Sequence, residues 1–242
     1  MATTPEEREQ AKQEAELSVA PRLLAQVAPL LPGRLVSGDA LYCQKALSRQ
    51  VRAAGGDYLF AIKGNQPNLL DDVTLLFREP PPGETFGYAR TLDTRRGRRE
   101  VREIRASGAL ASYLQVAGWP DAGLVLEVTA SVNWIRHPSQ PARHEVRYFL
   151  TSLPADTRPV DTLRAVRLHW HIENRLHWPR DLTLGEDACQ VRCGHAPQAL
   201  AGVRNAVLGV LHLHQVANLA ATLRATAWSG PQAALRLLGL NL

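Results

Sequence analysis

The sequence predicts an α/β protein: parallel strands alternating with helices, then a β-rich stretch, then a helical C-terminal region. Three observations support this prediction. Between residues 14 and 86, short apolar strands alternate with helical segments, and the connections are short. Residues 87–153 contain strand-like segments separated by turn residues. From residue 154 onward, apolar residues recur with helical spacing.

In the first part, glycine and proline mark where each predicted element ends. Pro32-Gly33 closes a helix, and Gly55-Gly56 stops another. The expected elements are a helix over 15–31, a strand over 34–37, a helix ending near 54, a strand over 58–62 and a helix over 67–77. Strands joined through a helix in this way are expected to run parallel in one sheet.

The rest of the chain changes character twice. The β-rich stretch, 87–153, is expected to be an insertion between two halves of one domain, with strands over 100–106, 124–135 and 144–150. The last part, 154–242, is expected to be helical, with helices over 159–178, 196–216, 217–227 and 231–239.

Composition limits the classes of protein that the chain can represent. Its 242 residues suffice for a sizeable core, and 45% hydrophobic with 21% charged residues is ordinary for a globular domain. Residues 1–13 are polar, unlike a secretory signal, and we expect a frayed start there. We expect no membrane span because no apolar run reaches about 18 residues.

Charge and cysteine content add two expectations. The net charge of +5 permits a polyanionic partner without requiring one. The three cysteines, Cys43, Cys189 and Cys193, cannot all pair, so a reducing cytoplasm is the simplest location.

The ten residues His169–Trp178, H-W-H-I-E-N-R-L-H-W, form the most informative stretch. In an α-helix, each step of four residues turns about 400°, so His169, Glu173 and His177 share one stripe. A neighbouring apolar stripe can pack on a sheet. Glu173 is therefore expected at the boundary of a packed face, where a carboxylate can bind a metal ion or transfer a proton.

Asp39 is the second candidate carboxylate. It follows a short apolar strand at its carboxyl end, where open α/β sheets place functional groups. The structural alternative is a helix N-cap, because a helix begins just after it. If the insertion lets the two halves of the sheet meet, Asp39 and Glu173 could bind Mg²⁺ together, since that ion prefers oxygen ligands.

Two other metal sites stay open as alternatives. His169, Glu173 and His177 could be zinc or iron ligands, or the histidines could form hydrogen bonds in a packed interface. Cys189-x₃-Cys193-x-His195 is an incomplete ligand set, and free thiols are the simpler interpretation.

Basic side chains suggest nucleic-acid contacts in two places. The first is an arginine-rich stretch containing Arg90, Arg95, Arg96, Arg98, Arg99, Arg102 and Arg105, which is either a DNA-contacting hairpin or a solvated charged loop. The second is Lys63-Gly64-Asn65-Gln66, which follows a buried strand and could contact a substrate, although Gly64-Asn65 also favours a turn.

Taken together, these segments resemble the DDE transposases of bacterial insertion sequences, in the branch that includes the H-repeat-associated proteins. The matching motifs are G-D-A-L-Y-C-Q at 38–44, G-G-D-Y-L-F-A-I-K-G-N-Q-P at 55–67, G-R-R-E-V-R at 97–102, Y-F-L-T-S-L at 148–153, H-W-H-I-E-N-R-L-H-W at 169–178, E-D-A-C-Q-V-R at 186–192, G-H-A-P at 194–197 and V-R-N-A-V-L at 203–208. The resemblance runs from about residue 14 to the C-terminus.

The resemblance implies an RNase H-like fold that cleaves DNA and transfers strands. Asp39 would be the second and Glu173 the third carboxylate of a catalytic trio that holds two Mg²⁺ ions. The implied partners are transposon ends and target DNA, together with a second copy in a homodimer, in the bacterial cytoplasm and on the nucleoid. The residues implied in DNA contact are Lys63, Asn65, Gln66, Arg98, Arg102 and Arg192.

One departure matters more than the agreements. The family places its first catalytic Asp in an Asp-Gly-Lys segment on an opening strand, and no such segment precedes Asp39. We therefore expect an incomplete RNase H-like sheet in an N-terminally truncated copy that does not transpose alone. The alternatives are a non-catalytic DNA-binding remnant and a zinc metalloprotein.

Overall fold

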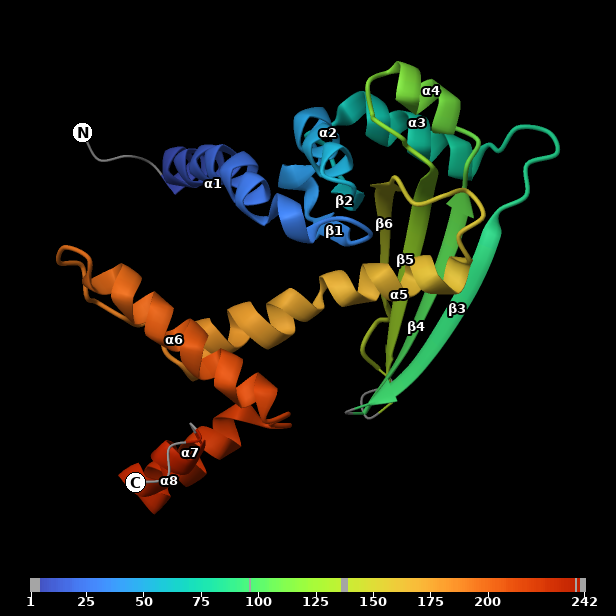
Figure 1. Ribbon diagram of the computed structural model, residues 1–242. Helices are drawn as coiled ribbons and strands as arrows, with labels where there is room; N and C mark the ends of the chain where they lie inside the picture. The colour runs from blue at the N-terminus through green and yellow to red at the C-terminus, as the bar shows by residue number, and fades with distance from the viewer. Residues whose placement is uncertain (1–4, 96, 136–138, 238, 240–242) are drawn as a thin grey trace. The chain divides into compact units, whose positions relative to one another are not determined.

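A computed structural model describes residues 5–95, 97–135, 139–237 and 239. It divides into two compact units, Met1–Arg167 and Leu168–Leu242, and each is described by itself. The first unit carries the sheet and the second is helical (Figure 1). No described helix is long and apolar enough to span a bilayer.

The N-terminal half of the first unit follows the predicted alternation of helices and strands. Its elements are α1 (Pro5–Val27), η1 (Ala28–Leu30), β1 (Leu35–Gly38), η2 (Ala40–Tyr42), α2 (Lys45–Ala53), β2 (Asp57–Ile62) and α3 (Pro67–Arg78). The helix α1 begins at Pro5, inside the segment expected to be frayed. Glutamate, glutamine, alanine and lysine are strong helix formers, which explains an early start.

The second half of this unit is dominated by two long hairpins. Its elements are β3 (Gly87–Arg95), β4 (Arg98–Ser107), α4 (Ala111–Val116), β5 (Leu124–Trp134), β6 (Arg143–Thr151) and α5 (Pro159–His169). Neither the strand β3 nor the short helix α4 was predicted from the sequence. The strands form one six-stranded sheet in the order β1-β2-β6-β5-β4-β3. β1 and β2 are parallel, as predicted, and the other neighbours are antiparallel. The predicted α/β class is confirmed.

β6 joins the two halves of the sheet because it pairs with both β2 and β5. Side chains reinforce the end of this pairing. The Thr151 hydroxyl donates to the Tyr58 carbonyl at 2.7 Å, and the Tyr58 N–H donates to the Ser152 hydroxyl oxygen at 3.0 Å. Ser152 in turn donates to Asp57 at 2.9 Å. Each buried polar group is thereby satisfied, which keeps the connection free of a desolvation penalty.

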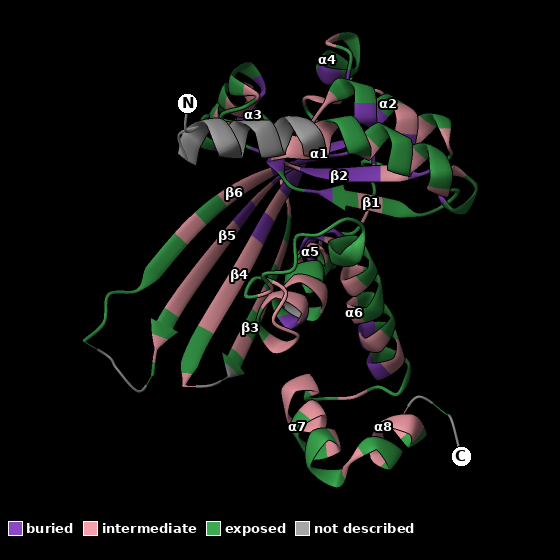
Figure 2. Cartoon of the chain, turned by 90° about the vertical axis from the view of Figure 1, so that its left-hand side faces the viewer, coloured by how far each residue is buried: buried purple, intermediate pink, exposed green. Residues whose placement is uncertain are grey.

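Apolar side chains cover both faces of the sheet where β2 lies. On one face, residues of β2 pack with α3 and α4, and on the other, α5 places Leu163 and Val166 against Leu59, Leu126 and Phe149. Figure 2 shows burial concentrated along β2 and the adjoining ends of β4–β6, with exposure toward the far ends of the hairpins. The core therefore anchors one end of the ribbon formed by β3–β6.

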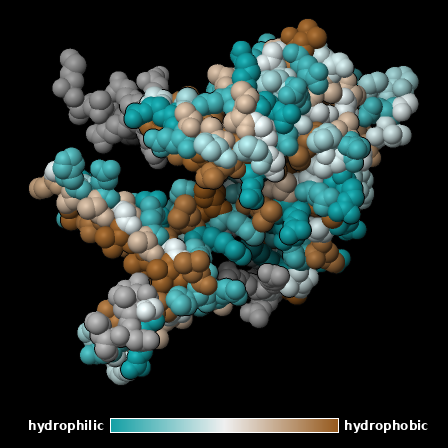
Figure 3. Space-filling model, viewed as in Figure 1, coloured by the Kyte–Doolittle hydropathy of each residue, from teal (hydrophilic) through white to brown (hydrophobic). Residues whose placement is uncertain are grey.

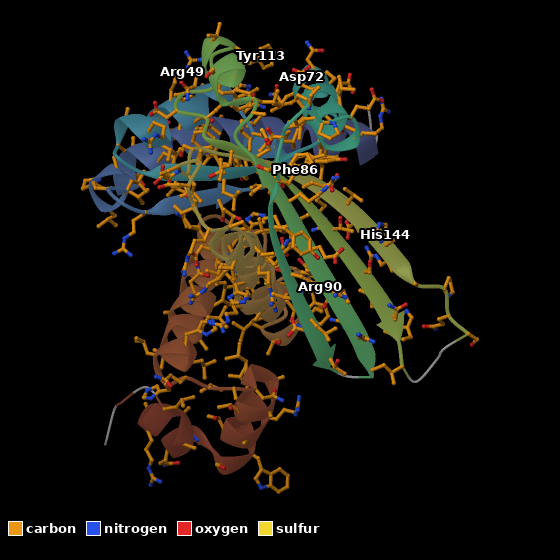
Figure 4. The ribbon with its side chains drawn as sticks, turned by 90° about the vertical axis from the view of Figure 1, so that its right-hand side faces the viewer. Arg49, Asp72, Phe86, Arg90, Tyr113 and His144 are labelled. Atoms are coloured by element: carbon orange, nitrogen blue, oxygen red, sulfur yellow. The ribbon has the colours of Figure 1, made fainter. Side chains whose placement is uncertain are left out.

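Two polar contacts hold the helical layer to this core. Arg105 of β4 lies over the rings of Phe77 and Phe86, at 5.2 and 5.0 Å from their centroids, and pairs with Glu127 at 2.6 Å. The Tyr113 hydroxyl of α4 donates to Asp72 of α3 at 2.9 Å, and both residues are labelled in Figure 4. One arginine of the basic stretch thus packs against the edge of the core while its side chain stays partly exposed.

The second unit comprises the π-helical turns η3 (Glu173–His177) and η4 (Pro179–Thr183), followed by α6 (Ala196–Leu213), α7 (Leu219–Ser229) and α8 (Pro231–Leu237). The assumption of regular α-helix through residue 178 was wrong, because the Trp178 N–H donates to the Glu173 carbonyl five residues back. Figure 3 shows apolar side chains gathered over α6, and exposed ones in this unit include Trp178, Leu182, Val203, Leu213 and Trp228.

The core of the first unit gives a stability prediction. Leu126 is fully buried in the middle of the sheet, so Leu126→Ala should lower the free energy of unfolding by about 2–5 kcal/mol. Val116, on the same unit, is 90% exposed, and Val116→Ala should change it by less than about 0.5 kcal/mol. Urea unfolding of the two variants tests this; equal effects would contradict the assigned packing of β5.

Candidate active site

Asp39 is exposed and lies immediately after β1, at the carboxyl end of the strand. One carboxylate oxygen, Oδ1, accepts the Leu41 N–H at 3.0 Å and so caps η2. The structural interpretation of Asp39 as a cap is therefore confirmed. Capping is compatible with a role as a metal ligand, because a carboxylate has a second oxygen and several lone pairs.

The loop after β2 lies at the same edge of the sheet, because β1 and β2 are parallel. Two of its side chains hold it to the segment after β1: the Asn65 amide donates to the Ala40 carbonyl at 2.6 Å, and the Gln66 amide donates to the Cys43 carbonyl at 3.0 Å. Lys63 is exposed at the start of this loop. The structure thus brings Asp39, Asn65 and Gln66 together, with both amides engaged in fixing the loop.

Two acidic residues influence Tyr42, at the end of η2. Burial raises the pKa of Tyr42, and the charges of Glu16 and Asp39 raise it further. Glu16 comes from α1, which packs against η2. Negative charge therefore accumulates on this edge of the sheet, which favours a cation there.

Glu173 is exposed at the start of η3. It lines a pocket of about 270 Å³ with Trp178, Asp181, Leu182 and Asp187. The two aspartates were missed by sequence reasoning, which considered His169 and His177 as the neighbours of Glu173. Asp181 could have been noticed, since it follows Glu173 by about two helical turns.

A charged pair in the same unit shapes the loop that carries Asp187. The Arg180 guanidinium makes two hydrogen bonds with the carboxylate of its neighbour Glu186, and the one from Nε is 2.7 Å long. Hydrogen bonding to Arg180 holds the pKa of Glu186 below its usual value. Bidentate pairing of this kind fixes orientation, so the residue after Glu186 has a defined place beside the pocket.

The two candidate carboxylates supply only part of a donor set for a hard divalent cation. Asp39 and Glu173 both offer accessible carboxylate oxygens, the ligands that Mg²⁺ prefers. They belong to different units, and each is considered within its own. Among the described residues, no three His, Cys, Asp or Glu side chains are grouped closely enough to hold a metal ion. The zinc alternatives at 169–177 and 189–195 therefore gain no support.

The arginine-rich stretch separates into paired and exposed members. Arg102 contacts Glu100 at 2.5 Å and Asp93 at 3.7 Å, and Arg90 contacts Glu103 at 3.4 Å. Figure 4 shows Arg90 and His144 along the outer strands of the ribbon. Arg98 and Arg99 are exposed near the hairpin turn, and within the described part of the chain no ion pair is recorded for either. The free positive charge is thus concentrated at the tip.

Arg192, the remaining predicted DNA contact, folds back on its own loop. Its Nη1 donates to the Cys189 and Val191 carbonyls at 2.6 and 2.9 Å. Hydrogen bonds from the Val191 backbone and the Arg204 side chain lower the pKa of Cys189. Arg192 thus stabilises its own loop, and Arg204 helps to lower the pKa of the Cys189 thiol.

The chain belongs to the transposase DDE domain family, whose model matches residues 9–208. Both candidate carboxylates, Asp39 and Glu173, fall within the matched segment.

Several relatives in Escherichia coli agree with this assignment. The chain is 30% identical to protein YbfL of strain K12 over 203 residues, which are 83% of this chain and 52% of YbfL. It is 29% identical to the H repeat-associated protein YhhI of strain K12, over 81% of this chain and 51% of YhhI, and 29% identical to YncI of O157:H7, over 75% and 46%. The names of YhhI and YncI include the word transposase. The chain spans about half the length of these relatives.

The thiols give a test of the loop around Cys189. Because its pKa is lowered, Cys189 should carry more thiolate at pH 7 and react with iodoacetamide well before Cys43, whose pKa burial raises to about 12. Arg204→Gln should slow the Cys189 reaction and Arg164→Gln should not. Mass spectrometry after brief alkylation measures both rates; unchanged labelling in Arg204→Gln would contradict the contact.

Proposed function

We propose that this protein is a DNA transposase of an insertion sequence, acting on transposon ends and target DNA. The main support is the family match, which contains two exposed carboxylates at positions expected for catalytic ligands. Bacterial relatives with transposase in their names support this proposal, in which the protein would act in the bacterial cytoplasm on nucleoid DNA.

In this proposal, Asp39 and Glu173 hold divalent cations, Mg²⁺ in the cell. Bound there, two such ions would lower the barrier to attack on a phosphodiester, first by water and then by a DNA 3′-hydroxyl. Asp39 provides its oxygen that does not cap η2, and the loop amides of Asn65 and Gln66 keep that carboxylate in place. Glu173 supplies its carboxylate from the pocket that Asp181 and Asp187 also line.

Contacts to DNA would come from exposed cations. Lys63 at the sheet edge and Arg98 at the hairpin tip are both exposed. Arg102 and Arg192 would act indirectly, because their guanidinium groups already bind protein atoms. A homodimer would supply two such surfaces to a pair of transposon ends.

We further propose that these 242 residues cut DNA poorly by themselves. They carry two of the three carboxylates that the resemblance implies, and two carboxylates leave a pair of cations with too few charged ligands. A protein that binds DNA without cutting it is the second candidate function, favoured by the exposed Arg98 and Arg99 at the hairpin tip.

Cation binding tests the two carboxylates. Asp39→Asn and Glu173→Gln should each weaken Mn²⁺ binding by more than about tenfold, since even outer-shell partners of a metal contribute that much. Asparagine keeps the cap on η2, so Asp39→Asn should fold normally. Isothermal titration calorimetry measures the change, with Glu79→Gln as a control exposed on the end of α3. Equal Mn²⁺ affinity in all four proteins would exclude the assigned ligands.

The hairpin gives a second test. Arg98→Gln should weaken binding to duplex DNA and reduce the slope of log affinity against log salt by about 1, the effect of one lost phosphate contact. Arg102→Gln should leave that slope nearly unchanged, because its guanidinium already pairs with Glu100 and Asp93. Fluorescence anisotropy at several salt concentrations compares them; an equal loss of slope would show that both contact DNA.

A further inference from the structure

The π-helical turn η3 places opposite charges in two different pockets. Glu173 lines the acidic pocket already described, with Asp181 and Asp187. Arg175, two residues later, lines a separate pocket with His212 and Gln215. π-helical turns are rare and are frequent at functional sites. The turn therefore separates a surface suited to cations from one suited to anions.

The Arg175 pocket has a volume of about 440 Å³ and lies where α6 ends and α7 begins. Its lining consists of Arg175, His212, Gln215, Val216, Ala217 and Leu219. These side chains offer a guanidinium, an imidazole and an amide, together with three aliphatic groups. Among the described residues, none that lines this pocket is acidic, and the volume falls within the usual range for small-molecule sites.

A hydrogen bond within the unit fixes the backbone next to the Arg175 side chain. The ring Nε2 of His212 lies 2.9 Å from the carbonyl oxygen of Arg175. A carbonyl oxygen can only accept, so Nε2 carries the hydrogen and donates it. This bond ties the end of α6 to η3 next to the Arg175 side chain.

Gln215 also lines the pocket, just after the end of α6. Gln215 has a φ of 52°, in the left-handed region that residues other than glycine rarely adopt. This conformation closes α6 in a Schellman motif, in which the Val216 N–H donates to the Leu211 carbonyl at 3.1 Å and the Gln215 N–H donates to the His212 carbonyl at 3.0 Å. Beyond it, Asn218 caps α7 by accepting the Ala221 N–H at 3.0 Å, so the positive end of that helix dipole lies next to the pocket.

We propose that the Arg175 pocket binds one nucleotide of a DNA strand. The guanidinium of Arg175 would contact the phosphate, the Gln215 amide would hydrogen-bond to it or to the base, and the aliphatic side chains would contact the sugar and base, while His212 would hold the backbone of Arg175 through its hydrogen bond to the carbonyl. This inference rests on the proposed function. It adds that the turn bearing Glu173 also fixes the DNA strand, two residues along the chain from the cation-binding carboxylate.

The first test compares two arginines of the same unit. Arg175→Gln should weaken binding of a short fluorescein-labelled oligonucleotide about tenfold, the loss expected for one charge-assisted hydrogen bond, and should lower the salt slope by about 1. Arg224, exposed on α7 and outside the pocket, provides the control, and Arg224→Gln should leave both unchanged. Equal affinities and slopes for the unmodified protein and both variants would overturn the pocket assignment while leaving DNA binding intact.

A second variant excludes misfolding as the cause. Gln215→Gly removes a side chain from the pocket and relieves the positive φ, so it should maintain or raise Tm while weakening oligonucleotide binding several-fold. Unweakened binding in Gln215→Gly would count against its role in the pocket.

Free ligands separate this inference from the proposed function. In NMR titrations of the full chain, a deoxynucleoside monophosphate should shift the backbone amides of Gln215 and Val216 more strongly than inorganic phosphate does. Equal shifts would reveal a site for free phosphate and overturn the nucleotide assignment. If the mononucleotide shifts these amides but no oligonucleotide binds, the Arg175 pocket is a nucleotide site and the transposase proposal is contradicted.

Discussion

The pairing of β2 with β6 is the constraint on which the first unit depends. β2 is almost entirely buried, and its partner β6 is separated from it in the sequence by β3, β4 and β5. Closing so long a loop has an entropic cost that buried contacts must offset. Tyr58 and Phe60 offset it on one face and Leu59 on the other, while Thr151 and Ser152 satisfy polar atoms at the end of the pairing. Because β1 pairs with β2 alone, the position of Asp39 also depends on β2 being fixed.

The alternation of side chains along the ribbon explains why its arginines differ in accessibility. Near the core, Arg105 is covered by two phenylalanine rings and paired with Glu127. Farther out, Arg102 shares the face of Glu100 and Asp93 and is neutralised by them. Toward the turn, Glu100 shares a face with Arg98 but already pairs with Arg102, and Arg98 is exposed without an ion pair among the described residues. A dense run of one residue type thus contains three different environments.

Much of the fold follows from local patterns. The strand at β2 is a continuous apolar run bounded by Gly-Gly and Lys-Gly, and α3 begins at a proline, so both were predictable within a residue or two. The placement of Asp39 at a strand end was predictable for the same reason. Three features were not: the π-helical turn at Glu173, the acidic partners of the Glu173 pocket, and the ion pairs of Arg102. The spacing of Asp181 from Glu173 and of Glu100 from Arg102 is compatible with these contacts, but which of several possible neighbours meet is decided only by the folded chain.

The cap on η2 has an evolutionary consequence. Asp39 contributes to local stability through one oxygen regardless of whether the other ever meets a cation. Glu173, exposed in a pocket, has no recorded hydrogen bond of that kind among the described residues. Under the proposed function, selection for a folded polypeptide would still retain the aspartate in copies that no longer transpose, while the glutamate would drift. The state of position 173 across decaying copies is therefore the better marker of retained mobility.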